Sequence, residues 1–335
     1  MKITFKNKKS INDNLCLIVC SCDDYSDVWY PYFEIFKQNW PDFPFEIILN
    51  TETKLYQHEG LNIKCLQLYK GLEDKVSWSE RMIKTLRTVE ADFVMLTCED
   101  NFIVSPVDTK KFNSAFDIIK NDRKISMLSF AGKMRSFEKT KWIGNFGRIS
   151  MKKRYRIVLD TAIWRKDALL RNLVPGESPW EFETNGTERA LWDFTEYYRY
   201  KNYDEFNDAE PIINVPFTSL NGIGIVGGKW RWRNPELFSK YNIPMDFSIR
   251  GIIDKETSLK QSKAAIEFSE TYRKEVEDNI KTQIKSQIIR RLPKSFLNLC
   301  VSLKKTFLTN KRTAQTELQV DQGQGEKKQN DFNGK

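Results

Sequence analysis

The motif Glu99-Asp100 places two acids side by side, directly after the apolar run Phe93–Thr97. The local sequence holds no lysine or arginine to pair with them, so the two charges would repel each other unless a cation or solvent relieved them. A Mg²⁺ or Mn²⁺ ion, held by one or two carboxylates and by substrate phosphates, would do so. The alternative is an exposed acidic turn that binds nothing.

A second acidic motif, Asp23-Asp24, follows the apolar run Leu15–Cys20. Here two carboxylates could hold a ribose hydroxyl or the edge of a base. The alternative is a plain helix N-terminus, where aspartate is favoured by the helix dipole.

Histidine chemistry is largely excluded, because His58 is the only histidine among 335 residues. One histidine cannot build a His-rich zinc site or a two-His facial triad, and no nucleophile motif lies near it. We therefore expect His58 in a surface loop. Acid/base catalysis would depend on carboxylates, and any metal would be a hard cation with oxygen ligands.

The elements that must position these acids alternate between strand and helix. Helices are predicted at Val28–Asn39 and at Ser77–Val89, the second opening with a capping box from Ser77 to Glu80. This alternation predicts an α/β fold with a mostly parallel sheet flanked by helices, and ligands of such sheets bind at the carboxyl ends of the strands. Apolar runs predict the strands, namely Leu15–Cys20, Phe45–Leu49, Ile63–Leu68, Phe93–Thr97, Ile125–Phe130, Ile157–Leu159 and Ile212–Val215.

The formal net charge of +9 is concentrated near the C-terminus. Nine lysines and arginines and no acid lie between Asn279 and Thr316, and residues 317–335 carry a net charge of −1, which leaves residues 1–278 at +1. A nearly neutral body argues against a nucleic-acid partner. Apolar residues from Ile280 to Phe307 recur at helical spacing, which predicts C-terminal basic amphipathic helices. Such helices suit an anionic membrane surface, or they pack on the body or on a partner, and both interpretations stay open.

Six motifs stand in a characteristic order along residues 15–255. They are Ser21-Cys22-Asp23-Asp24, Trp78-Ser79-Glu80-Arg81, Glu99-Asp100-Asn101-Phe102, Ala162-Ile163-Trp164-Arg165-Lys166-Asp167, Ser178-Pro179-Trp180-Glu181-Phe182-Glu183 and Gly227-Gly228-Lys229-Trp230. Together they resemble a family of bacterial glycosyltransferases of GT-A fold that assemble capsule, O-antigen and related surface polysaccharides. The fifth motif and its spacing from the fourth are the most specific elements.

The resemblance implies a nucleotide-sugar donor whose diphosphate is bridged by Mn²⁺ or Mg²⁺. Asp100 matches the metal ligand and Glu99 a contact to the ribose or donor sugar, although this chain has Glu-Asp where Asp-Asp is commoner. It also implies that Asp23 and Asp24 lie beside the nucleoside and that Arg81 reaches the phosphates or the sugar.

A second clamp on the diphosphate is Lys229, because the glycines before it let the backbone approach a phosphate closely. The alternative is a plain turn with an exposed lysine. With histidine excluded, the catalytic base would be Glu181 or Glu183, and Glu181 is favoured because it directly follows Trp180. The alternative is that Trp180 and Phe182 are core residues and that both acids are structural. Acceptor contacts are predicted at Asp160, Trp164 and Trp180.

The predicted organisation is a flexible N-terminus (1–14), a GT-A-like catalytic domain (15–270), a basic amphipathic helical segment (271–312) and a disordered tail (313–335). The sequence shows no signal-peptide core, no apolar stretch long enough to span a membrane and no CxxC pair. We expect a cytoplasmic, reduced protein that lies peripherally at the inner face of the cell membrane.

The predicted function is a nucleotide-sugar-dependent hexosyltransferase that moves a sugar to a lipid-linked or oligosaccharide acceptor in surface polysaccharide synthesis. The alternative is an inactive GT-A-like protein that scaffolds a membrane-associated synthesis complex. A nucleotidyltransferase fits less well, because the acidic segment after the first predicted strand lacks a glycine-rich phosphate loop.

Overall fold

The computed structural model describes residues 14–68, 70, 76–130, 137–151, 155–200, 219–220, 224–258 and 260. Several predictions lie outside these residues: the N-terminus before Asn14, the strand Ile212–Val215, the basic segment 271–312 and the tail 313–335.

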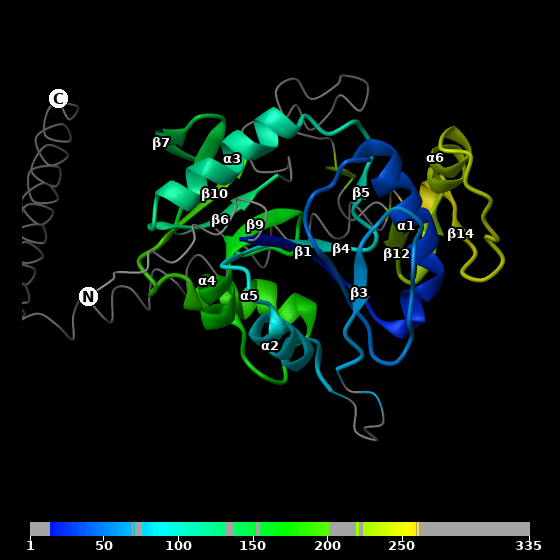
Figure 1. Ribbon diagram of the computed structural model, residues 1–335, viewed down its shortest axis with the longest axis horizontal. Helices are drawn as coiled ribbons and strands as arrows, with labels where there is room; N and C mark the ends of the chain where they lie inside the picture. The colour runs from blue at the N-terminus through cyan, green and yellow to red at the C-terminus, as the bar shows by residue number, and fades with distance from the viewer. Residues whose placement is uncertain are drawn as a thin grey trace, which may run out of the picture. The chain divides into compact units, whose positions relative to one another are not determined.

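A nine-stranded sheet forms the centre of the fold, with the strand order β3-β2-β1-β4-β9-β6-β10-β8-β7 (Figure 1). Strands β3, β2, β1 and β4 pair in parallel, β9 runs antiparallel between β4 and β6, and β10 pairs in parallel with β6. The predicted mostly parallel α/β fold is confirmed. The strands are β1 (Leu15–Cys20), β2 (Ile47–Asn50), β3 (Ile63–Cys65), β4 (Phe93–Cys98), β6 (Ile125–Ser129), β7 (Phe137–Ile143), β8 (Phe146–Ile149), β9 (Ala162–Arg165) and β10 (Glu196–Tyr200).

Helices cover both faces of this sheet, because every residue of the central strand β1 is buried and alternate side chains point to opposite faces. Leu17 belongs to the cluster that includes α1 (Ser26–Asn39) and α3 (Thr109–Asn121), whereas Ile18 belongs to the cluster of α2 (Trp78–Thr88), α4 (Lys166–Asn172) and α5 (Pro179–Arg189). Figure 1 shows the two groups of helices on opposite sides of the strands.

Capping boxes begin α2 and α5. The predicted box at Ser77 is confirmed: the Ser77 hydroxyl accepts from the Glu80 amide, and the Glu80 carboxylate accepts from the Ser77 amide. Ser178 and Glu181 make the same exchange at α5. These boxes satisfy amide groups that have no partner inside the helix, so each helix begins at a fixed residue.

The predicted strand at Ile157–Leu159 is wrong. These residues are buried without strand pairing, and the strand begins later, at Ala162 of β9. The prediction depended on the apolar character of this run alone, and such runs also occur in buried loops. The predicted helix Val28–Asn39 is confirmed within α1.

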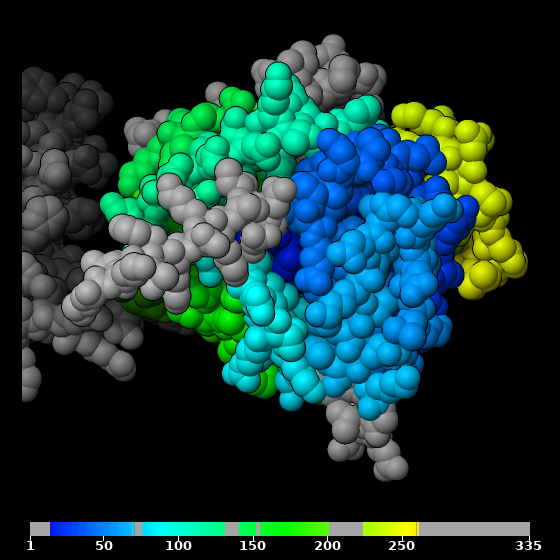
Figure 2. Space-filling model, viewed as in Figure 1, coloured from blue at the N-terminus to red at the C-terminus, as the bar shows by residue number. Residues whose placement is uncertain are grey.

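The segment 224–258 packs beside α1 (Figures 1 and 2). It contains a small sheet of β12 (Ile225–Val226), β13 (Lys229–Arg231) and β14 (Ile252–Ile253), and the helix α6 (Asn234–Lys240). The Asn39 amide of α1 donates to the Tyr241 hydroxyl at 3.0 Å, which fixes the segment to the body. The short strands β5 (Phe102–Ile103) and β11 (Ser219–Leu220) pair with each other. Among the described residues, no helix is long and apolar enough to cross a bilayer.

Candidate functional site

Two loops begin side by side where β1 and β4 end. The strands pair in parallel with Cys20 opposite Cys98, so Ser21–Tyr25 and Glu99–Asn101 leave the same edge of the sheet together. Both acidic motifs therefore lie at the carboxyl edge, as predicted for a ligand site in a parallel sheet.

Glu99 is a buried acid with little to compensate its charge. Its side chain is 7 % exposed, and no side chain of the described residues donates a hydrogen bond to it. Burial, reinforced by the neighbouring charge of Asp100, raises the pKa of Glu99 well above its ordinary value. Such a group holds its proton to higher pH than an exposed glutamate does, and once ionised it gains more from a bound cation.

Asp100 lies directly beneath the hairpin β12–β13. Burial raises its pKa, against the opposing effect of a hydrogen bond from the Ile225 amide. A Cβ atom at Gly224 would lie 2.7 Å from the Asp100 Cβ and 2.9 Å from the Asp100 carbonyl oxygen. Glycine at position 224 therefore lets the hairpin approach the acid this closely.

Arg231 brings a cation to the same place from β13. Its Nε atom is buried, and no group in the described part of the chain forms a hydrogen bond with it. Burial lowers the pKa of Arg231, and the charge of Asp100 opposes that shift. The Arg231 amide donates to the Gly224 carbonyl at 3.2 Å, and Gly224 is the residue whose backbone lies against Asp100.

Arg250 joins the segment 224–258 to the loop after β1. Its guanidinium donates two bonds of 2.6 Å to the Asp27 carboxylate and stacks over the Tyr25 ring, with its Cζ atom 4.3 Å from the ring centroid. Burial raises the pKa of the Tyr25 phenol, as does the charge of Glu99. Tyr25 and Arg250 therefore lie within electrostatic reach of Glu99.

The Asp23 carboxylate is occupied by the loop after β2. It accepts from the Thr53 amide at 3.0 Å and from the Lys54 amide at 3.2 Å. Burial acts to raise the pKa of Asp23, but these bonds and one from the Thr53 hydroxyl outweigh it and lower the pKa overall. Asp24 is exposed. A donor contact by either acid stays a prediction.

Arg81 is buried and points to the same edge from α2. Its guanidinium pairs with Glu52 and reaches the Ser21 carbonyl at 3.5 Å. This arrangement puts a cation beside the loop after β1, as the resemblance implied, but its contact with a donor stays a prediction.

Lys229 is exposed beside the turn Gly227-Gly228. Both glycines have positive φ, 56° and 78°, which strains residues with a side chain. Trp230, next to it, is fully buried, so Lys229 and Arg231 point to the opposite side of β13 from that indole. Lys229 is therefore at the rim and Arg231 further inside.

Of the two candidate bases, Glu183 lies closer to the strand ends. Its carboxylate accepts from the Leu159 amide at 2.8 Å, and the Leu159 carbonyl accepts from the Cys98 thiol at 3.7 Å. Glu181, in contrast, is exposed and forms the capping box, and its bonds with Ser178 lower its pKa. The base assignments stay predictions, and these contacts favour Glu183.

The three predicted acceptor residues have different surroundings. Asp160 pairs with Arg199 at 2.9 Å and follows Leu159 at the edge of β4. Trp180 is 75 % exposed and available to a ligand. The prediction for Trp164 is wrong, because its indole is fully buried among the apolar residues between the sheet and α4.

The donor set at the edge fits a divalent cation shared with a ligand. Glu99 and Asp100 supply two carboxylates whose pKa values are raised. No group of three or more His, Cys, Asp or Glu residues within the described chain could hold a metal by protein atoms alone. Mg²⁺ is commonly bound by one or two carboxylates plus substrate phosphates, so these residues match the protein's share of such a site.

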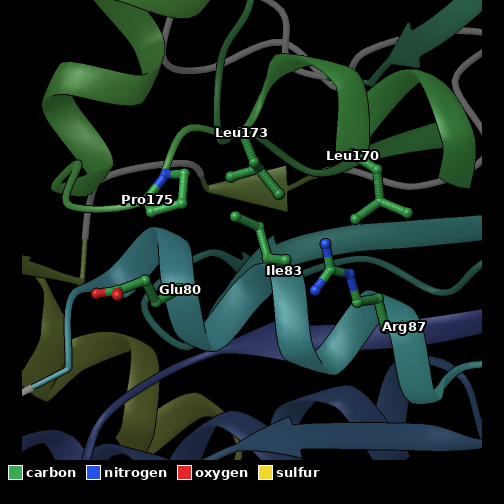
Figure 3. A pocket seen from close by; sticks show the side chains of 6 residues that line it. All are labelled: Glu80, Ile83, Arg87, Leu170, Leu173 and Pro175. Carbon is green, nitrogen blue, oxygen red and sulfur yellow. The ribbon is translucent and has the colours of Figure 1, made fainter.

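A separate groove of about 440 Å³ lies between α2 and α4 (Figure 3). Ile83 and Arg87 point from α2 toward Leu173 and Leu170. The groove holds none of the predicted site residues, so we assign it no part in the chemistry at the strand ends.

Arg231 and Arg250 were not predicted as site residues from the sequence. Lys229-Trp230-Arg231-Trp232-Arg233 is visible as alternating bases and aromatics, but that pattern is also typical of nucleic-acid binding. Arg250 is 223 residues from Asp27, and no local pattern reveals their pairing.

No family model and no curated protein matches the sequence. The chain resembles solved structures of glycosyltransferases. TarS 1-349 from S. aureus is 17 % identical, with a TM-score of 0.37 over 56 % of this chain and 60 % of that one. The mannosyltransferase PcManGT from Pyrobaculum calidifontis, in complex with GDP-Man and Mn²⁺, is 13 % identical, with a TM-score of 0.38 over 57 % and 55 %. The chain thus spans less than two thirds of these structures, and likenesses of this strength do not establish a common function.

Proposed function

We propose that this protein is a glycosyltransferase that uses a nucleoside-diphosphate sugar. The observation that carries the proposal is the pair of adjacent acids, buried Glu99 and half-buried Asp100, at the carboxyl end of β4, with Arg231 beside it. Two acids alone would be an unfavourable cluster. Together with a divalent cation and arginines, they form a polar centre suited to a diphosphate, which carries negative charge and many oxygen acceptors.

In the proposed reaction, an acceptor hydroxyl attacks the anomeric carbon of the donor sugar. The bond from that carbon to the diphosphate oxygen breaks, its electron pair leaves with the nucleoside diphosphate, and the hydroxyl proton passes to a carboxylate. Glu183 is the favoured base, because it lies against the segment that borders β4. A bound Mn²⁺ or Mg²⁺ would supply charge stabilisation of the leaving diphosphate, with Asp100 as its ligand and Glu99 beside it.

The donor contacts proposed for the rest of the site are Asp23, Asp24, Arg81 and Lys229, and the acceptor contacts are Asp160 and Trp180. We further propose a lipid-linked or oligosaccharide acceptor of bacterial surface polysaccharide synthesis, with the basic segment 271–312 at an anionic membrane surface. Exposed Trp180 supports the sugar acceptor, since indole rings stack on sugars through their apolar faces.

The test starts with thermal-shift measurements using UDP, GDP and TDP, each with and without Mn²⁺. We expect one nucleotide to raise the unfolding temperature, more strongly with the metal, and the Asp100→Asn variant to lose the metal-dependent part. Transfer from the matching nucleotide sugar would then be followed by mass spectrometry. If none of the nucleotides or their sugars bound, the inactive scaffold would be the better explanation.

The base is tested on the same donor with Glu183→Gln and Glu181→Gln. We expect Glu183→Gln to reduce kcat strongly with little change in donor KM, and Glu181→Gln to retain turnover, because glutamine also serves in a capping box. The reverse result would indicate that Glu181 is the base.

A further inference from the structure

The hairpin β12–β13 brings the Arg231 guanidinium to the acidic pair. The Arg231 Nε atom is buried and has no hydrogen-bond partner among the residues that the structure describes. A buried charged donor left unpaired costs free energy, typically about 1 to 3 kcal/mol or more, so such a group in a folded protein calls for an explanation. An anionic ligand that pairs with the guanidinium would provide one.

Backbone contacts fix where this guanidinium lies. The Ile225 amide donates to the Asp100 carboxylate, and Ile225 pairs with Trp230, the residue before Arg231. Trp230 is fully buried and packs edge-on against Phe238 at 5.2 Å. The hairpin therefore cannot rotate without exposing this indole, and Arg231 stays on the opposite side of β13.

Arg250 holds the other end of the hairpin in place. It pairs with Asp27 at the start of α1, and the same guanidinium reaches the Gly228 carbonyl in the turn at 3.4 Å. Its bonds are thus directed to protein groups. The Arg231 Nε atom has no hydrogen-bond partner among the described residues, so of these two arginines it is the one whose donors are not all used by protein groups.

We infer that Arg231 binds the diphosphate of the donor and that Arg250 is a positioning residue for the hairpin that carries it. The inference rests on the proposed function and adds to it the residue that recognises the leaving group. A planar guanidinium binds phosphate oxygens through two parallel N–H groups, and negative charge grows on those oxygens as the glycosidic bond breaks. Lys229, at the rim of the same side of β13, would add a second and more mobile cation.

The experiment measures calorimetric affinities of the full chain for UDP, GDP and TDP and for the corresponding nucleosides, at fixed Mn²⁺. We expect Arg231→Gln to weaken binding of the preferred nucleoside diphosphate by about tenfold to a hundredfold, as for loss of a charged hydrogen bond, with nucleoside binding unchanged. Arg87→Gln is the matched control, because it removes the same charge at an exposed position in the groove of Figure 3.

The outcomes separate the inference from the proposed function. If the wild-type chain binds no nucleoside diphosphate, the proposed function fails. If it binds one and Arg231→Gln binds it equally well, the inference is overturned. Should Arg231→Gln unfold at the assay temperature, Arg231→Met decides in its place, since it keeps an unbranched apolar stem. Arg250→Lys should reduce diphosphate affinity less than Arg231→Gln while lowering the unfolding temperature more.

Discussion

Glu99 should destabilise the empty protein at neutral pH, and Glu99→Gln should therefore stabilise it. The side chain is 7 % exposed, and both burial and the Asp100 charge raise its pKa above the ordinary 4.5. Between pH 4.5 and the raised pKa, Glu99 is therefore protonated in the folded state and ionised in the unfolded state. Stability falls as the pH rises from 4.5 toward the raised pKa, by about 1.4 kcal/mol for each pH unit. Above that range the whole penalty is present, and glutamine of nearly the same shape removes it.

The gain should be about 1 to 3 kcal/mol at pH 8, because a buried charge without a partner costs at least this much. For a domain of this size, that raises the unfolding temperature by about 2 to 10 °C. Thermal unfolding of both proteins, followed by circular dichroism from pH 5 to pH 8 without metal, should show the difference shrinking toward pH 5. Glu181→Gln is the control, because hydrogen bonds lower that pKa below the ordinary 4.5 and any effect of its titration falls below the pH range of the assay. An equal or lower unfolding temperature of Glu99→Gln at pH 8 would refute the reasoning.

Three further pairs of substitutions test the hairpin, the core and the predicted acceptor contact. Gly224→Ala should destabilise the protein by about 1 to 3 kcal/mol and weaken nucleotide binding, because its Cβ would lie 2.7 Å from the Asp100 Cβ. The control Gly186→Ala should be neutral or stabilising, because its Cβ meets nothing closer than 3.5 Å. Thermal unfolding and calorimetry compare the two variants. Arg250→Lys should lower stability by about 1 to 3 kcal/mol, because it loses the two bonds to Asp27, and a double-mutant cycle with Asp27→Asn should show coupling. Trp164→Phe should lower the unfolding temperature and leave the acceptor KM unchanged, whereas Trp180→Ala should leave the unfolding temperature unchanged and raise the acceptor KM. A raised acceptor KM in Trp164→Phe would contradict the burial of Trp164.

Local patterns predicted the elements that local physics controls. The run Leu15–Cys20 became β1 with the same bounds, because a continuous apolar run between helices is stable only inside a sheet covered on both faces. Ser77 began α2 as predicted, because a capping box needs only residues three apart. The run Ile157–Leu159 failed, since burial of apolar side chains does not require a strand.

Part of the site could be predicted in the same way. Asp23 and Glu99 follow adjacent strands, so their position at one edge follows from the strand pattern alone. Their surroundings could not be predicted, because the partners are distant in sequence: Asp23 binds the loop at Thr53, and Asp100 lies under Gly224. Trp164 shows the same limit, since a tryptophan beside a polar motif turned out to face the core.

The sequence by itself determined the α/β alternation, the acids at the strand ends, the exclusion of histidine catalysis and the concentration of positive charge after Asn279. Each of these depends on composition or on contacts a few residues apart. Only the tertiary structure decided which charges meet. Long-range packing brought Arg231 and Arg250 to the edge formed by β1 and β4 and buried Glu99, because pKa and ligand access depend on burial and on neighbours that the chain reaches only by folding.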